Sequence, residues 1–249
     1  MEEILKVENL RKSFGGVNAV DGCSFAVEKG KITALIGPNG AGKTTVFDLI
    51  SGFLTPDAGS IVFQDRRIDR LAVWTRSRLG IARTFQQVRL FLNLTLRDNI
   101  ALAMALHDDH MWRGVLQPHL KEFEDGVLLH ALQKVGIDRV PDTLASALSY
   151  GQQKLLEFAR ALAFPHTLLM LDEPVAGIAP PLRLEMVRII EDLKHKGETM
   201  LIIEHDMDFI MQLADIVVVM HEGKVLMEGT PEEVKKHPQV LEAYLGEQL

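Results

Sequence analysis

The sequence contains almost no cysteine and no apolar stretch long enough to cross a membrane. Cys23 is the only cysteine among 249 residues, so no disulfide can form within the chain, and we expect a buried thiol and a reducing compartment. A helix needs about 20 apolar residues to span a bilayer, whereas the longest candidate, 161–171, is interrupted by Pro165 and His166. The first residues lack the basic and apolar regions of a secretory signal peptide. If such a protein works at a membrane, it must dock on an embedded partner.

The chain also lacks an excess of positive charge. Its formal net charge is −7, which argues against a general nucleic-acid binder, because those proteins present basic surfaces. Hydrophobic residues make up 47% of the sequence, which is enough for a packed core and argues against disorder. The length suits one large domain or two small ones.

A phosphate-binding motif occupies residues 37–44. The sequence GPNGAGKT fits the pattern G-x-x-x-x-G-K-S/T, between an expected strand, 32–36, and an expected helix, 45–52. Backbone N–H groups in such a loop, at a helix N-terminus, form a site for anions. Lys43 supplies a charge for the β- and γ-phosphates, and Thr44 supplies a hydroxyl for Mg²⁺. The alternative is a chance match, which the flanking strand and helix disfavour, so we predict that the protein binds a nucleoside triphosphate.

Two acidic residues follow a continuous apolar segment. Residues 167–171 are expected to form a fully buried parallel strand, and Asp172 and Glu173 stand at its carboxyl end. Open α/β sheets bind ligands at that edge. We expect Asp172 to support Mg²⁺ through a bound water and Glu173 to orient or polarise the attacking water. The alternative is two solvated surface acids.

Three further residues are candidates for the same site. Gln86 follows an expected strand, 81–85, and an amide oxygen can bind a hard metal ion, although an exposed loop amide is the commoner role. His205 follows another expected strand, 200–204, and is either a ligand of the γ-phosphate or an ordinary surface histidine. Phe14 either stacks on a nucleotide base or packs in the core.

The middle of the chain has a different pattern. Between residues 88 and 148 helical periodicity replaces the β-branched runs, with helices expected at 95–106 and 120–135. We therefore expect a helical subdomain inserted into an α/β core. The stretch between these helices carries histidines whose spacing does not suit a metal ion and which we expect to be solvated: His107, His110 and His119.

The remaining segments complete the expected architecture. Ser149 is expected to cap a helix over 150–163, and the N-terminus of that helix is either simply capped or directed at a phosphate. A capping box from Thr230 to Glu233 starts a helical tail that reaches about residue 245. Strands are expected at 3–9, 18–28, 60–63, 216–220 and 224–227.

Taken in order, these motifs resemble the ATP-binding subunits of ABC transporters over essentially the whole chain. The most specific motif is LSYGQQ at 148–153, which precedes the segment LLMLDEP at 168–174. Finer features resemble the branched-chain amino acid importer subgroup, which also includes relatives that handle urea, short amides and other small solutes. The segments that carry this finer resemblance are 82–86, 89–91, 151–153, 174–177, 203–207, 228–231 and 242–246.

The resemblance implies a fold and a division of the chain. The fold is α/β: a P-loop NTPase core of the RecA type, an N-terminal antiparallel β subdomain and an inserted α-helical subdomain, together the ABC ATPase fold. The chain is then one ABC ATP-binding domain, 1–249. Its core comprises 1–87 and 164–229, the helical subdomain 88–163, and the C-terminal helical tail 230–249.

The resemblance also assigns roles to individual residues. Glu173 matches the catalytic base, His205 the γ-phosphate switch, and Lys43 the phosphate-binding lysine. The Mg²⁺ ligands match Thr44 and Gln86, with Asp172 acting through water. The ATP-binding set is Phe14, Gly37, Pro38, Asn39, Gly40, Ala41, Gly42, Lys43, Thr44, Thr45, Gln86 and Asp172. The signature set, which reaches the ATP of the partner subunit, is Ser149, Tyr150, Gly151 and Gln152.

The implied activity is ATP hydrolysis coupled to solute transport, with ATP and Mg²⁺ as cofactors. The expected partners are a second ATPase subunit, related or identical, in a head-to-tail dimer, integral membrane permease subunits, and indirectly a solute-binding protein, without nucleic acid. The expected location is peripheral, on the cytoplasmic face of the cell membrane. Two alternatives are a soluble ABC ATPase acting on nucleic acid or ribosomes and a small-molecule phosphotransferase.

Two residues depart from the family pattern. Tyr150 replaces the first glycine of the commonest signature form, which the importer subgroup tolerates. Ala179 stands where an acidic or amide residue is expected to contact the other subunit. We therefore expect one polar contact between the two ATP sites to be missing.

Overall fold

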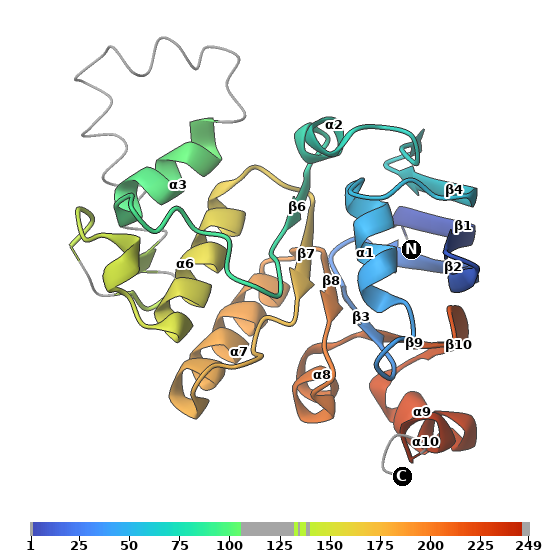
Figure 1. Ribbon diagram of the computed structural model, residues 1–249. Helices are drawn as coiled ribbons and strands as arrows, with labels where there is room; N and C mark the ends of the chain where they lie inside the picture. The colour runs from blue at the N-terminus through green and yellow to red at the C-terminus, as the bar shows by residue number, and fades with distance from the viewer. Residues whose placement is uncertain (1, 106–131, 134, 138–139, 246–249) are drawn as a thin grey trace.

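The computed structural model describes residues 2–105, 132–133, 135–137 and 140–245. Two β-sheets and a set of helices make up this part of the chain (Figure 1). In chain order the elements are β1 Glu3–Phe14, β2 Val17–Glu28, β3 Ile32–Ile36, α1 Lys43–Ser51, β4 Ala58–Phe63, β5 Arg66–Arg67, α2 Val73–Arg78, β6 Ile81–Arg83, α3 Leu96–Ala105, α6 Tyr150–Ala163, β7 Leu168–Asp172, α7 Pro180–His195, β8 Met200–Ile203, α8 Met207–Leu213, β9 Ile216–His221, β10 Lys224–Gly229, α9 Pro231–Lys236 and α10 Pro238–Leu245.

The larger sheet has the strand order β10-β9-β3-β8-β7-β6. Its strands run parallel except for β10, which pairs antiparallel with β9. Every residue of β3, β7 and β8 is buried, because helices or the second sheet cover both faces and such strands must be apolar throughout. The carboxyl ends of β3, β6, β7 and β8 therefore meet at one edge, which confirms the expected α/β core.

The smaller sheet is antiparallel, with the order β2-β1-β4-β5. Helix α1 lies between the two sheets, and its Phe47 and Leu49 share a hydrophobic cluster with Leu5 and Phe25 of the smaller sheet. Cys23 is fully buried in the same cluster, as expected. Strand β1 runs to Phe14, beyond the expected end at residue 9, because its second half continues to pair with β2.

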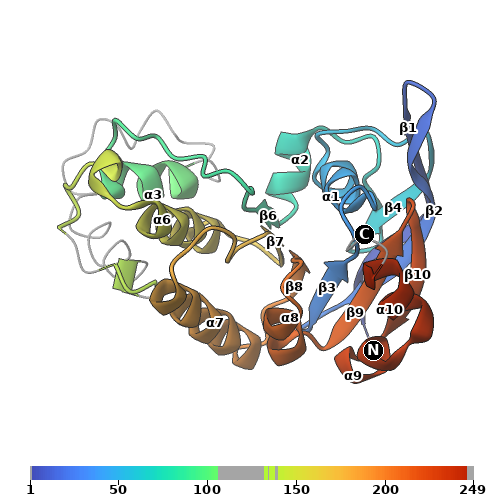
Figure 2. The same ribbon diagram turned by 60° about the horizontal axis from the view of Figure 1, so that its bottom comes forward.

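The opposite face of the larger sheet is covered by helices. Figure 2 shows α6 and α7 side by side, and these helices share a second cluster with α3 and α8. This cluster includes Leu155 of α6, Ile190 of α7 and Leu171 of β7. The part of the expected helical subdomain that the structure describes is helical, whereas His107, His110, His119 and most of the expected helix 120–135 lie outside the described residues.

Other expected boundaries also differ from the structure. Helix α1 begins at Lys43, because the left-handed Gly42 directly precedes it (φ 97°). Strand β6 ends at Arg83 rather than at residue 85. The C-terminal tail is two helices, α9 and α10, because Pro238 disfavours a helical conformation at His237 (ψ 121°) and carries no N–H of its own.

The two predicted helix caps are confirmed. Ser149 and Gln152 form a capping box at the start of α6, and Thr230 and Glu233 form one at the start of α9. Among the described residues, no helix has the length and apolar character that crossing a membrane requires.

Candidate active site

The phosphate loop, residues 37–42, is packed too closely for side chains at two of its glycines. A Cβ atom at Gly37 would lie 2.1 Å from the backbone oxygen of Met220, and one at Gly42 would lie 2.2 Å from that of Ala19. Both glycines also have positive φ angles, 148° and 97°. The loop therefore sits against neighbouring backbone, and this contact fixes where its N–H groups point.

The crest of the loop faces open space. Asn39 and Gly40 are exposed, and nothing lies within 4 Å of the position of a Cβ at Gly40. The Lys43 ammonium lies in the same loop, where its Nζ donates to the carbonyl oxygens of Gly37 (2.6 Å) and Pro38 (2.9 Å). An open backbone crest at a helix N-terminus with a lysine beside it suits a phosphate group. These residues therefore fit the phosphates of ATP.

The rest of the expected ATP set borders the loop or lies beyond it. Thr44 is exposed in the first turn of α1, Thr45 is half-buried, and Ala41 is buried. Phe14 is 45% exposed at the end of β1, with the Lys12 Nζ 5.6 Å from its ring centroid. The core alternative for Phe14 was therefore wrong, and its ring is accessible for stacking.

Gln86, Glu173 and His205 meet at the carboxyl ends of β6, β7 and β8. Gln86 Nε2 donates to Glu173 Oε2 at 2.9 Å, and His205 Nδ1 lies 3.8 Å from Glu173 Oε1. Because its amide nitrogen is used in this way, Gln86 keeps its amide oxygen as an acceptor for a hard cation. Glu173 has a left-handed backbone (φ 47°), which is uncommon for a residue with a side chain. Sequence reasoning placed all three residues at one edge, and the structure confirms this.

Asp172 is held by a residue to which sequence reasoning assigned no role. Its carboxylate is buried and forms an ion pair with Arg83 at 3.0 Å, while Arg83 also pairs with Asp48 at 2.6 Å. Burial raises the pKa of Asp172, and the charge of Arg83 opposes that shift. An acid oriented in this way by a guanidinium fits the indirect, water-mediated support of Mg²⁺ expected for it.

Glu204 is a second residue whose role was missed. It is completely buried, its Oε1 accepts the N–H of Val175 at 3.2 Å, and its Oε2 accepts the N–H of His205 at 3.1 Å. Burial raises the pKa of Glu204, and these N–H donors oppose the shift. The side chain therefore ties the turn after Glu173 to the loop that carries His205. A carboxylate directly after the apolar strand MLII was the visible signal.

The signature residues lie on the helical side of the chain. Figure 1 shows α6 and α1 on either side of β6 and β7. Ser149 caps α6, Gln152 completes the cap, and Tyr150 is 48% exposed. A Cβ at Gly151 would lie 2.4 Å from Leu182 Cδ1, so α6 approaches α7 closely at this point. That these residues contact a partner's ATP remains a prediction.

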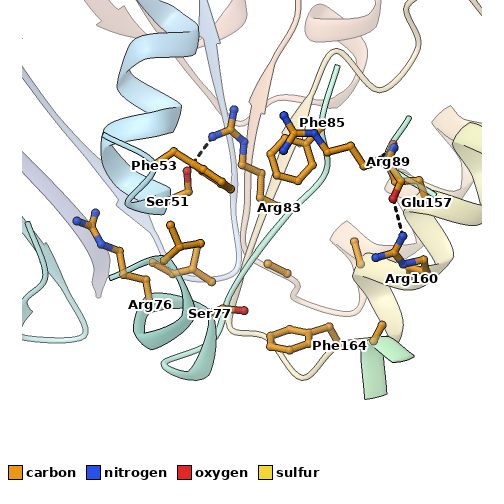
Figure 3. A pocket seen from close by; sticks show the side chains of 15 residues that line it. Ser51, Phe53, Arg76, Ser77, Arg83, Phe85, Arg89, Glu157, Arg160 and Phe164 are labelled. Carbon is orange, nitrogen blue, oxygen red and sulfur yellow. Dashed lines mark hydrogen bonds between the residues drawn. The ribbon is translucent and has the colours of Figure 1, made fainter. Parts of the chain in front are cut away.

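A cavity of about 290 Å³ lies between α2 and α6, next to the segment that carries Gln86 (Figure 3). Aromatic rings form part of its wall, including Phe53 and Phe85, whose centroids are 5.6 Å apart. Arginines from both sides also line it, among them Arg83, Arg89 and Arg160. The cavity lies where the part of the chain that carries α2 and β6 faces the helix α6.

The phosphate loop lies at the same sheet edge as the two acids at the end of β7 and the glutamine and histidine that follow the neighbouring strands. Together these groups define a P-loop ATPase. The chain belongs to the ABC transporter family, which matches residues 20–176. Residues 224–249 also match the family described as branched-chain amino acid ATP-binding cassette transporter. The ABC ATPase fold expected from the sequence is thereby confirmed.

Individual relatives match the chain over nearly its full length. The chain is 38% identical to the high-affinity branched-chain amino acid transport ATP-binding protein LivG of Salmonella typhimurium, covering 99% of each chain. It is 39% identical to the probable branched-chain amino acid transport ATP-binding protein LivG of Archaeoglobus fulgidus, covering 99% of this chain and 96% of the relative. A crystal structure of a nucleotide-free ATP-binding cassette from an ABC transporter is similar with a TM-score of 0.84 and 33% identity, covering 98% of this chain and 99% of the other.

Proposed function

We propose that this chain hydrolyses ATP by in-line attack of water on the γ-phosphate, with Glu173 as the base that orients and polarises the water. The observation that carries this proposal is the position of Glu173, which is hydrogen-bonded by Gln86 and adjacent to His205 at the sheet edge where ligands bind. Lys43 and the loop N–H groups bind the phosphates and stabilise the charge that develops during transfer. His205 hydrogen-bonds the γ-phosphate.

Magnesium would be held by the hydroxyl of Thr44, the amide oxygen of Gln86 and, through water, Asp172. When bound, Mg²⁺ neutralises charge on the β- and γ-phosphates. Arg83 keeps the Asp172 carboxylate oriented for that contact. Phe14 stacks on the adenine, since its ring is accessible at the end of β1.

The hydrolysis powers import of branched-chain amino acids across a membrane. Relatives that match 96–99% of their own length carry that solute in their names. The runner-up is the same machine for urea, short amides or another small solute. The acidic balance of the chain, with a net charge of −7, supports neither a nucleic-acid partner nor a ribosomal one.

The chain works as a peripheral subunit on the cytoplasmic face of the membrane. It pairs head to tail with a second ATPase chain, so that Ser149, Tyr150, Gly151 and Gln152 reach the partner's ATP. Permease subunits contact residues 88–99 and the cavity between α2 and α6. This cavity lies between the ATPase core and the helical half. A solute-binding protein delivers the cargo to the permease. We keep the domain boundaries expected from the sequence, with the ATPase core at 1–87 and 164–229, the helical subdomain at 88–163 and the tail at 230–249.

Glu173→Gln tests the hydrolysis. The variant should bind ATP with near-normal affinity, accumulate an ATP-bound dimer and lose roughly a hundredfold or more in turnover, because a general base contributes a factor on the order of 10²–10⁴. Steady-state phosphate release and size-exclusion chromatography with ATP measure both properties. Normal turnover in this variant would remove Glu173 from the mechanism.

Isolation of the tagged chain from detergent-solubilised membranes tests the transport role. Two integral membrane subunits and a second ATPase should copurify, and uptake of labelled leucine should fail in cells that carry Glu173→Gln while urea uptake is unchanged. Recovery of ribosomes or nucleic acid, without membrane proteins, would point to the soluble alternative.

A further inference from the structure

We infer that Lys154, on the signature helix α6, is a positioning residue that holds the backbone of Glu173 in its catalytic orientation. The inference rests on the proposed function, because it assumes that Glu173 is the base. Lys154 Nζ donates to the backbone oxygen of Glu173 at 2.8 Å. The side chain is only 4% exposed, so the bond is shielded from water.

The backbone of Glu173 needs such support. Its φ angle of 47° puts it in the left-handed region, which costs on the order of 1 kcal/mol for a residue with a Cβ. Pro174 follows it, so the next residue offers no N–H. The Glu173 carbonyl accepts the Ala176 N–H at 3.2 Å and the Lys154 ammonium at 2.8 Å. These two donors fix the peptide plane and, with it, the direction of the Glu173 side chain.

A buried ammonium must itself be stabilised, and this one lies among acids. Burial lowers the pKa of Lys154, while the charges of Glu157, Glu204, Asp172 and Glu173 oppose the shift. One of these acids is itself an orienting group, since Glu204 holds the loop of His205, and Asp172 is oriented by Arg83. Lys154, Glu157 and Asp172 also line one small pocket beside the carboxyl end of β7, so nearby carboxylates favour the charged form of this ammonium.

The position of Lys154 on α6 gives the contact a second consequence. It lies one turn after Tyr150, and its Nζ is 6.0 Å from the Tyr150 ring centroid. In the proposed dimer the N-terminus of α6 touches the partner's ATP, while Lys154 touches the chain's own catalytic glutamate. Any shift of α6 therefore changes the support of Glu173. Ala179 cannot supply a polar contact between the sites, and Lys154 provides a different connection.

Lys154→Met, which keeps an unbranched side chain as far as Cε and removes the donor, tests the inference in the full chain. We expect kcat for ATP to fall roughly tenfold or more, because misplacing a reacting group by about 1 Å can cost on the order of a hundredfold. KM for ATP should stay within threefold, and Lys154→Arg, which restores a cationic donor, should recover most of kcat. In the Glu173→Gln background, Lys154→Met should still form the ATP-bound dimer.

Lys194→Met is the matched control. Lys194 Nζ also donates to a backbone carbonyl at 2.8 Å, that of Leu213, and pairs with Asp215 at 2.8 Å. It stands in the last turn of α7, at the end of that helix away from the segment that follows Glu173. This variant also loses a half-buried lysine bond, but it should keep its kcat. If Lys154→Met fails to fold, Lys154→Gln, whose amide stops short of the Nζ position, replaces it with the same expectation.

Three outcomes would overturn the inference: a kcat for Lys154→Met within twofold of wild type, an equal loss in Lys194→Met, or no recovery in Lys154→Arg. Glu173→Gln, measured in parallel, separates the two proposals. Normal turnover in Glu173→Gln refutes the role of Glu173 and the inference with it. Loss of turnover in Glu173→Gln with normal turnover in Lys154→Met refutes the inference alone.

Discussion

The phosphate loop and the junction between α6 and β7 both hold functional groups in place, but they do so with different parts of the chain. In the loop the functional groups are backbone N–H groups, and glycines let the chain fold tightly against Ala19 and Met220. At the junction three charged side chains of one helix reach across to backbone groups of other segments. Lys154 donates to the backbone oxygen of Glu173. Glu157 accepts the backbone N–H of Arg89, and Arg160 donates to the backbone oxygen of Arg89.

The difference shows what each arrangement depends on. The loop depends on local φ and ψ angles, so few substitutions are tolerated but the geometry is insensitive to pH. The junction depends on buried and half-buried charges that follow one another three residues apart along α6, so it responds to protonation and to movement of the helix. The predictions below separate these dependences, in order of decreasing effect.

Gly42→Ala should distort the phosphate loop and destabilise the protein. The added methyl would lie 2.2 Å from the Ala19 oxygen at a φ of 97°, and strain plus overpacking should cost roughly 2–5 kcal/mol of unfolding free energy. Gly40→Ala is the control, since its φ is 81° but nothing lies within 4 Å. It should cost only about 1 kcal/mol and still weaken ATP binding, because its methyl occupies the open crest. Chemical denaturation and nucleotide titration measure both, and equal losses of stability would contradict the packing argument.

Glu157→Gln tests whether the junction makes the stability of the protein depend on pH. Burial raises the pKa of Glu157 from its ordinary 4.5 to about 7, opposed by the Arg89 N–H and by the charges of Arg160 and Lys154. Between these pH values the folded state keeps a proton that the unfolded state releases, so the contribution of this carboxyl is present below pH 4.5 and is lost as the pH rises to 7.

Wild type should therefore lose about 2 kcal/mol more stability than Glu157→Gln between pH 5 and pH 7.5. Urea denaturation at a series of pH values measures this difference. Parallel stability curves for the two proteins would show that Glu157 does not titrate in this range.

Ser149→Ala and Thr230→Ala form the pair with the smallest effect. Each removes the hydroxyl of a capping box and should cost about 1 kcal/mol of stability. Only Ser149→Ala should also weaken the ATP-bound dimer, because Thr230 caps the remote helix α9. Thermal unfolding and ATP-dependent dimerisation measure the two effects. Equal dimerisation of the two variants would contradict a contact between Ser149 and the partner's ATP.

Much of the site could be predicted because its determinants are local. The apolar runs of β3, β7 and β8 identify buried parallel strands, and the residues after them share an edge by topology. This reasoning placed Glu173 and His205 at one edge, as the structure shows, while the phosphate-loop motif itself identified Lys43. The capping boxes at Ser149 and Thr230 were equally visible, since a cap is defined by residues three apart.

The remaining features depend on contacts between distant segments. Arg83 meets Asp172 across 89 residues, and Lys154 meets the Glu173 carbonyl across 19, and no local pattern predicts such pairs. The extension of β1 to Phe14 follows from its pairing with β2 rather than from its own alternation. The break at Pro238 is different, because proline within an expected helix was a signal available in the sequence.

The left-handed backbone of Glu173 sets stability against activity in this chain. Glycine adopts that conformation without penalty and asparagine at a smaller one, so either residue would relieve strain at this position. Neither carries a carboxylate, so the proposed role of Glu173 as the base implies that the more stable sequences are inactive. Screens that select only for thermal stability should therefore enrich inactive variants at position 173.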